Sequence, residues 1–365
     1  MILRLQSSWM VRKKEDDVID LFSSFKQQNY EIKSDNPSFY LFLKSLEKGI
    51  NYPDDLMSVA KEFNFKTETV DALIAKLRSY DLLIEDHKNE NPPLETLYDR
   101  QVRYFRTFED NTCSGEQLND NLQNKTVLIV GLGGYGSWIA LLCARIGIRN
   151  IIGIDFDLVE ITNLHRQILY DRSDIGLPKV KACEKKIKEV DTEINFIGHH
   201  LKINTPSDLY PFLDNVDLIF NPFSYLPLKK ALNHPSGLIA QAAMDKNKPC
   251  LTFGGSWVGP LSIPGKTLCY FCAIKKLELN TNLDPDHRNQ NIQKRAFAPP
   301  IVMCCSLAVH EASRFLSGCD TSQVLNGAIQ LDMFSFSKSQ YLPIESSPDC
   351  DFCSSNIIEN SMVVR

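Results

Sequence analysis

The chain has 365 residues, of which 43% are hydrophobic and 23% are charged, and its formal net charge is -5. This composition predicts a soluble globular protein of two domains, or of one large domain with an appendage, and gives no reason to expect nucleic-acid binding. The chain starts without the pattern of a secretory signal, and no apolar run is long enough to span a membrane. We therefore expect a cytoplasmic protein that binds neither nucleic acid nor a membrane.

Residues 1–90 predict a small N-terminal domain of the winged-helix type. Residues 1–12 alternate loosely between apolar and polar side chains, which predicts a strand. Leu82-Leu83-Ile84 predicts a short closing strand, and apolar residues recur at helical spacing in three stretches before it: 39–46, 56–63 and 70–77. This order is typical of a winged helix, although a generic small helical domain would give the same pattern.

A linker follows this domain. Residues 87–93 are polar and end in two prolines, and residues 94–124 are polar and mostly helical in pattern. We therefore assign 91–124 to a linker and an entry helix, and 125–365 to the large domain.

The large domain opens with a strand, a glycine turn, a helix, a second strand and an acid. The apolar run Lys125–Val130 leads into GLGGYG at 131–136, and Asp155 ends the next strand. Glycines leave room for a phosphate, and a helix N-terminus after them offers free N–H groups to an anion. Asp155 has the position of a carboxylate that binds ribose hydroxyls. The order predicts a Rossmann-like, doubly wound α/β domain that binds a nucleotide.

Three side chains downstream of Asp155 favour ATP over NAD. Asn163, Arg166 and Lys179 lie close together in sequence, and hydride transfer to nicotinamide requires none of them. Arg offers two parallel donors, Lys a point charge, and Asn both a donor and an acceptor, which together suit a triphosphate.

These motifs resemble the ubiquitin-activating-like superfamily of adenylyltransferases, the ThiF and MoeB type of molybdopterin and thiamine biosynthesis. The resemblance covers roughly 95–353 and includes Leu97–Gln101, GLGGYG, DFDLVEITNLHRQ at 155–167 and GLPKV at 176–180. It implies a homodimer that binds ATP and Mg²⁺, in which Arg100 reaches the triphosphate bound by the partner subunit. The phosphate turn would contain Gly131, Gly133, Gly134 and Gly136, Asp155 would bind the ribose, and the phosphates would contact Asn163, Arg166, Gln167 and Lys179.

One position departs from the family pattern. The resemblance places a magnesium-binding aspartate near Ser224, and serine is a much weaker ligand for magnesium than a carboxylate. We expect that Asp157 or Asn221 takes this role, or that the phosphates hold most of the metal, unless the register is shifted.

Two C-x-x-C units predict a structural zinc site. Cys269 with Cys272 and Cys350 with Cys353 would supply four thiolates, which make a closed tetrahedral site. A redox pair is the alternative for either unit alone. The long spacing between the units means that the metal would hold the C-terminal segment against the domain.

The sequence lacks the cysteine that ubiquitin-type activators use to accept an acyl group. The predicted crossover loop, 273–300, contains no cysteine, and Cys304 and Cys305 begin an apolar helix where burial is expected. With the winged-helix-like front end, this resembles enzymes that adenylate the microcin C precursor peptide or form pantocin A.

The resemblance implies ATP-dependent activation of a carboxylate on a precursor peptide that the N-terminal domain binds, followed by modification or cyclisation in antibiotic biosynthesis. Two alternatives stay open. One is adenylation of the C-terminus of a ubiquitin-like sulfur carrier, and the other is a nucleotide-binding regulator without catalysis.

Overall fold

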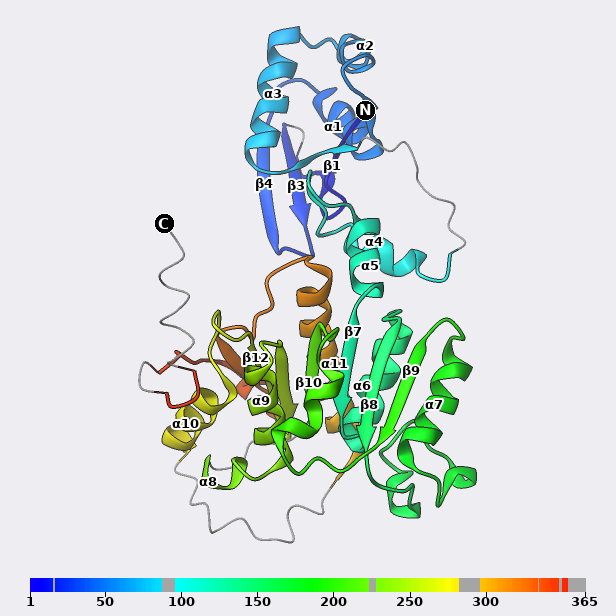
Figure 1. Cartoon of the computed structure of the whole chain (residues 1–365). Helices are drawn as coiled ribbons and strands as arrows, with labels where there is room; N and C mark the ends of the chain where they lie inside the picture. Colours follow the sequence, from blue (N-terminus) through cyan, green and yellow to red (C-terminus); the bar gives the residue numbers. More distant parts are fainter. Residues whose placement is uncertain are drawn as a thin grey trace. The chain divides into compact units, whose positions relative to one another are not determined.

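The structure is a computed structural model that describes residues 1–15, 17–86, 96–222, 228–281, 296–333, 335–347 and 350–353. The chain divides into two compact units, Met1–Asp120 and Asn121–Arg365, and Figure 1 colours them along the sequence. Among the described residues, no helix combines the length and the apolar character needed to cross a membrane.

The first unit contains two antiparallel sheets and three helices that share one core. One sheet has the order β5-β1-β6: Ile50–Asn51, Ile2–Leu5 and Leu83–Asp86. The other has the order β2-β3-β4: Met10–Lys13, Val18–Ser23 and Gln28–Lys33. The helices are α1 (Phe39–Lys48), α2 (Leu56–Glu62) and α3 (Thr67–Ser79).

The three predicted helices and the closing strand are confirmed, but the strand predicted at 1–12 is wrong in one respect. It is two strands, β1 and β2, which belong to different sheets. Strand β1 pairs with β6 along its whole length and with β5 at Ile2 and Leu3, so only its last two residues lack a paired strand on the β5 side. The β3–β4 hairpin was not predicted from the sequence.

The first unit continues beyond the predicted boundary at residue 90 and includes α4 (Asp99–Phe105). The reason is a buried polar contact with β1 and the residue that follows it. Arg4 Nη1 lies 2.7 Å from Glu109 Oε1, and Gln6 Nε2 donates to the Glu109 carbonyl at 2.6 Å. Helix α5 (Gly115–Gln123) crosses from one unit to the next. The predicted polar linker, 87–93, lies outside the described residues.

The second unit is built on one large sheet with the strand order β14-β13-β12-β11-β10-β7-β8-β9. The five strands from β11 to β9 run parallel and the others antiparallel. Their bounds are Gln340–Pro343, Gly327–Gln330, Trp257–Ser262, Cys250–Gly254, Leu218–Asn221, Thr126–Val130, Asn150–Asp155 and Asn195–His200.

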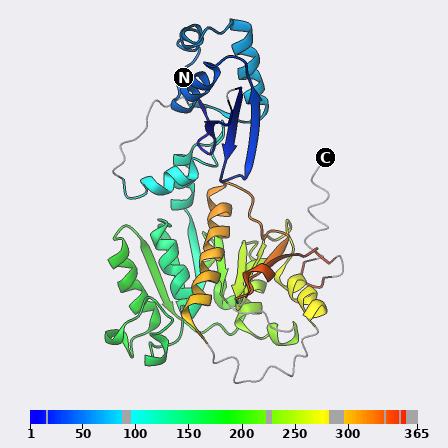
Figure 2. The ribbon, with the colours of Figure 1, turned by 180° about the vertical axis from the view of Figure 1, so that it is seen from behind.

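Helices cover both faces of this sheet, as the predicted doubly wound fold requires. One face carries α6 (Gly134–Arg145), α7 (Lys179–Val190) and α11 (Ala298–Ser317), and Figure 2 shows α11 in front of the strands. The other face carries α9 (Pro235–Asp245), with α8 (Leu228–Ala231) and α10 (Tyr270–Thr281) beside it. Residues 273–281 of the predicted crossover loop continue α10, and 282–295 lie outside the described residues.

The strand order places a ligand site at β7. The chain passes from β7 to β8 and β9 on one side, then returns to β10 on the other side of β7. Connections that leave a strand in opposite directions open a crevice at the carboxyl ends of parallel strands.

Candidate nucleotide site and cysteine cluster

A cavity of about 390 Å³ lies at the carboxyl ends of β7 and β8. Its lining includes seven of the residues predicted from the sequence: Gly131, Gly133, Gly134, Gly136, Asp155, Asp157 and Lys179. These residues come from three separate segments, which the parallel strands bring to one edge of the sheet.

The glycine turn depends on the absence of side chains at two positions. Gly131 has φ of 90°, which disfavours residues with a Cβ. A Cβ on Gly136 would lie 1.8 Å from the Gly131 carbonyl oxygen, so only glycine fits there. Helix α6 begins at Gly134, directly after the turn, and directs its first N–H groups toward the cavity edge. This geometry suits a phosphate group.

Asp155 stabilises the same turn from the end of β8. Its two carboxylate oxygens accept hydrogen bonds from the backbone N–H of Leu132 at 2.6 Å and of Asp157 at 2.7 Å. Burial raises the pKa of Asp155, while Lys179 and these two bonds oppose the shift. The carboxylate therefore shapes the turn in addition to the ribose binding predicted for it.

Lys179 is buried at the start of α7 and forms an ion pair inside the cavity. Its Nζ lies 2.7 Å from Asp157 Oδ2, and its side chain is 6% exposed. The Asp157 side chain is 49% exposed and lines the cavity, so its carboxylate is accessible to a ligand or a cation.

Asn163, Arg166 and Gln167 do not line the cavity, although two of them lie beside the glycine turn. Arg166 Nε would be 3.8 Å from a Cβ on Gly134, and Gln167 Nε2 would be 3.9 Å from one on Gly133. Gln167 is 3% exposed, and its Oε1 has no hydrogen-bond partner among the described residues. A buried amide oxygen without a hydrogen-bond partner, next to a phosphate-type turn, is consistent with a site in which a ligand supplies the missing hydrogen bond. Asn163 caps its own turn through the Glu160 N–H.

The cavity includes residues that the sequence analysis did not identify. Phe156 is 51% exposed, and Lys202 Nζ lies 5.3 Å from the centre of its ring. The other unpredicted lining residues are Val130, Tyr135, Ile154, Leu201, Ile203, Pro222 and Pro235. Phe156 lies between Asp155 and Asp157 in the motif DFDLVEITNLHRQ. Its position between two predicted site residues was the sequence signal that could have identified it.

Asn221, the other residue considered as a magnesium ligand, is fully buried at the end of β10 and does not line the cavity, although the next residue, Pro222, does. Its Nδ2 donates to the Ser236 carbonyl at 2.9 Å, and its Oδ1 has no hydrogen-bond partner among the described residues. Ser224 lies outside the described residues. Arg100 belongs to α4 in the first unit, so its role toward a nucleotide stays a prediction.

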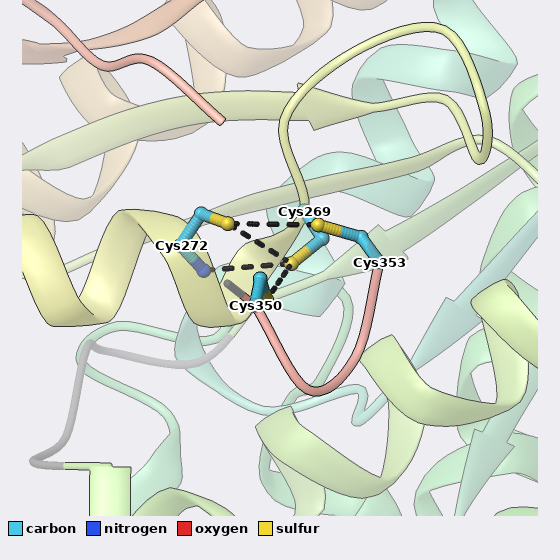
Figure 3. A group of neighbouring side chains, drawn as sticks. All are labelled: Cys269, Cys272, Cys350 and Cys353. Atoms are coloured by element: carbon cyan, nitrogen blue, oxygen red, sulfur yellow. Dashed lines mark hydrogen bonds between the residues drawn. The ribbon is translucent and has the colours of Figure 1, made fainter. Parts of the chain in front are cut away.

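The four cysteines of the C-x-x-C units form one cluster, which Figure 3 shows. Their sulfur atoms all lie within 4.8 Å of one another, with Cys269 3.6 Å from Cys272 and Cys272 3.6 Å from Cys353. Sulfur atoms at the corners of a zinc tetrahedron lie about 3.8 Å apart, given Zn–S bonds of ~2.3 Å. Hydrogen bonds from Cys269 and Cys353 lower the pKa of Cys272, whereas the pKa values of Cys269 and Cys353 are raised. The cluster could therefore bind a metal ion.

Cys304 and Cys305 are buried, as predicted. Both are 0% exposed, and burial raises the pKa of Cys304 to about 12 and that of Cys305 above its usual range. Neither thiol is suited to accept an acyl group, because the thiolate is the nucleophile.

Comparisons with known proteins agree with this geometry. Over 119 residues the chain is 34% identical to the adenylyltransferase and sulfurtransferase MOCS3 of Aedes aegypti, which covers 33% of this chain and 27% of that protein. Over 176 residues it is 28% identical to ubiquitin-like modifier-activating enzyme 5 of Gallus gallus, a match that covers 45% of this chain and 43% of that protein. The chain thus spans less than half the length of these two relatives.

Solved structures share the fold over nearly the whole chain. E. coli MccB with ATP has a TM-score of 0.75 at 22% identity, covering 97% of this chain and 100% of that one. The microcin C7 biosynthetic enzyme MccB in complex with N-formylated MccA has a TM-score of 0.74, also at 22% identity. This match covers 97% of this chain and 100% of that one. The ThiF family matches residues 98–353, which include the glycine turn, the cavity and both C-x-x-C units. This protein belongs to the ThiF family.

Proposed function

We propose that the chain uses ATP to adenylate a carboxylate on a ribosomally made precursor peptide, which leads to modification or cyclisation in the biosynthesis of a microcin- or pantocin-like antibiotic. The observation that carries this proposal is the extent of the likeness to MccB, which covers 97% of the chain. It includes most of residues 1–97, which the ThiF match leaves out. The cavity beside a phosphate-type turn supports the ATP-dependent step.

In the proposed reaction, a carboxylate oxygen of the peptide attacks the α-phosphorus of ATP. The bond between that phosphorus and the bridging oxygen to the β-phosphate breaks, and pyrophosphate leaves with the electron pair. The N-terminus of α6 and the Lys179 ammonium would stabilise the developing negative charge. A nucleophile from the peptide itself would then displace AMP, which needs no thioester on the enzyme.

Pyrophosphate release tests this step. We expect release that depends on added peptide, assayed with a panel of synthetic precursor peptides that includes N-formylated MccA. Lys179→Ala should lower the rate at least about a hundredfold, as loss of a group that stabilises transition-state charge does. Release with a sulfur carrier that ends in Gly-Gly, but with no peptide, would favour the first alternative. ATP binding without release on either substrate would favour a regulator.

The same assay tests the proposed homodimer with shared sites. Arg100→Ala and Lys179→Ala chains should each be inactive alone. In subunit-exchanged mixtures some dimers would carry one intact site, so part of the activity should return. Mixtures that exchange subunits but stay inactive would contradict the shared site.

We further propose that Asp157 is the protein ligand of Mg²⁺. Its carboxylate is accessible in the cavity and lies beside Lys179, whereas Asn221 is fully buried and does not line the cavity. Lys179 neutralises the Asp157 carboxylate in the ion pair described above, and a bound magnesium ion would compete with Lys179 for that carboxylate. Carboxylate oxygens and phosphates are the usual ligands of Mg²⁺ in nucleotide sites.

Asp157→Asn should therefore change ATP affinity in opposite directions without and with magnesium, which calorimetry can measure. Without magnesium, the variant should bind ATP at least as tightly as the wild type, because Lys179 is released and a negative charge is removed. With magnesium, it should bind about tenfold more weakly, in line with a lost charge-assisted contact. Glu184→Gln, on the exposed face of α7, is the control and should behave as wild type. An unchanged magnesium dependence in Asp157→Asn would exclude this role.

The cysteine cluster is proposed to hold one structural zinc ion. Purified protein should contain about one equivalent by metal analysis, and Cys350→Ala should lose it. The variant should also unfold at a lower denaturant concentration. Its free energy of unfolding should fall by several kcal/mol, because a structural metal contributes directly to folding free energy. Cys319→Ala, a partly exposed cysteine outside the cluster, should keep both the metal and the stability. A Cys350→Ala chain with full metal content would rule the site out.

The peptide is proposed to bind the first unit as an added strand on β4. Strand β1 is paired on both sides at Ile2 and Leu3, which leaves only two residues of edge, and Glu47 of α1 accepts the Val11 N–H of β2. Among the described residues, β4 has no backbone partner on its outer side. Tyr80 is 46% exposed with its ring 5.1 Å from Tyr30 of β4, which offers aromatic contacts for peptide side chains. Strand addition uses such an edge for affinity and side-chain contacts for specificity.

Hydrogen exchange tests this docking edge. A bound peptide should slow exchange of outward amides in Gln28–Lys33 about tenfold, because they gain hydrogen bonds. Met10–Lys13, on the opposite edge of the sheet, should not change and is the internal control. Saturating peptide that leaves residues 28–33 unprotected would contradict binding at β4.

A further inference from the structure

A chain of buried hydroxyl groups connects the cysteine cluster with the wall of the nucleotide cavity. Tyr270 directly follows Cys269 and is 1% exposed. Its hydroxyl donates to Ser236 Oγ at 2.9 Å, and Ser236 is fully buried.

The direction of these hydrogen bonds is determined at His234. Ser236 Oγ lies 2.9 Å from His234 Nδ1, and the Ser236 N–H also donates to that nitrogen at 3.3 Å. Because Tyr270 donates to Ser236, the serine hydroxyl is free to donate to Nδ1. Burial lowers the pKa of His234, which favours the neutral ring, and the bond from the Ser236 N–H makes Nδ1 its accepting nitrogen. This cap fixes the first turn of α9.

Ser236 also connects this turn to the sheet. Its carbonyl accepts from Asn221 Nδ2 at 2.9 Å, and the same nitrogen lies 3.3 Å from Thr252 Oγ1. The residue after Asn221, Pro222, and the residue before Ser236, Pro235, both line the cavity. One wall of the cavity is therefore held through Ser236, and Ser236 is held by Tyr270.

We propose that Tyr270 is a positioning residue through which the metal-loaded cysteine cluster sets the affinity of the cavity for ATP. A metal bound to Cys269 and Cys272 would fix the start of α10 on both sides of Tyr270. The hydroxyl then holds Ser236, and Ser236 holds the wall at Pro222 and Pro235. Close-packed interiors transmit small shifts of this kind. The inference rests on the proposed zinc and ATP sites, but neither the cluster nor Tyr270 lines the cavity.

The test is Tyr270→Phe in the full chain, with ATP affinity measured by calorimetry and metal content measured on the same sample. We expect full metal content and ATP binding that is about three- to tenfold weaker, the range for one lost internal hydrogen bond. Tyr210→Phe is the matched control. It removes a hydroxyl that bonds Asp245 at 2.6 Å, at the other end of α9, and should leave ATP affinity unchanged. Wild-type affinity in Tyr270→Phe would overturn the proposal.

Two thermodynamic cycles distinguish an effect carried by Tyr270 from general destabilisation of the fold. One combines metal removal with Tyr270→Phe, and the other is a double-mutant cycle of Tyr270→Phe with Ser236→Ala. Removal of the metal with a chelator should weaken ATP binding in the wild type but should weaken it little further in Tyr270→Phe. Ser236→Ala should reproduce the loss in metal-loaded protein, and the double variant should lose no more than either single one. The Ser236 cycle needs no metal-free protein, so it tests the step from Tyr270 to Ser236 even where the stripped chain unfolds. Additive losses in either cycle would refute a shared path. ATP binding needs no peptide, so the result does not depend on whether a peptide is adenylated.

Discussion

The close approach of Gly136 to the Gly131 carbonyl is the constraint on which the nucleotide site depends. A Cβ at Gly136 would meet that oxygen at 1.8 Å, so no other residue permits the turn. The turn brings the start of α6 against the end of β7, and Asp155 holds it from β8 through the Leu132 N–H. Backbone groups thus form a phosphate-type site before any side chain contributes, and the rest of the cavity is arranged around them.

The side chains around this turn are costly for the folded protein. Lys179 and Asp155 are almost completely buried, and Gln167 buries an oxygen that makes no hydrogen bond. Buried charges and unsatisfied polar groups each reduce stability, so a fold retains them where a ligand or a reaction uses them. The ion pair between Lys179 and Asp157 offsets part of the cost without filling the cavity. The proposed binding of ATP with Mg²⁺ would give each of these groups a partner.

Sequence reasoning succeeded where the chemistry is local and failed where the fold brings distant segments together. The glycine turn and Asp155 follow from one short motif, and seven predicted residues line the cavity. Lys202 and Pro235 line it too, but only the parallel strand order places them there. The β3–β4 hairpin escaped prediction, and a charged residue interrupts its apolar pattern: Asp20 is 1% exposed and pairs with Arg12 at 2.7 Å. Likewise, nothing in the local sequence of Tyr270 indicates its contact with Ser236.

The division of the chain into two units explains how recognition could change without loss of the nucleotide site. The first unit has its own core, which includes Leu3, Leu21, Phe42 and Leu77. The glycine turn belongs to the second unit and is not part of this core. The ThiF match begins at residue 98, so the family pattern constrains little of the first unit. Surface positions on β4 can vary at small cost in stability, whereas Gly136 cannot vary at all. Under the proposed function, this asymmetry lets one activation chemistry serve different peptides, because substrate choice is carried by the part of the chain that the chemistry leaves free.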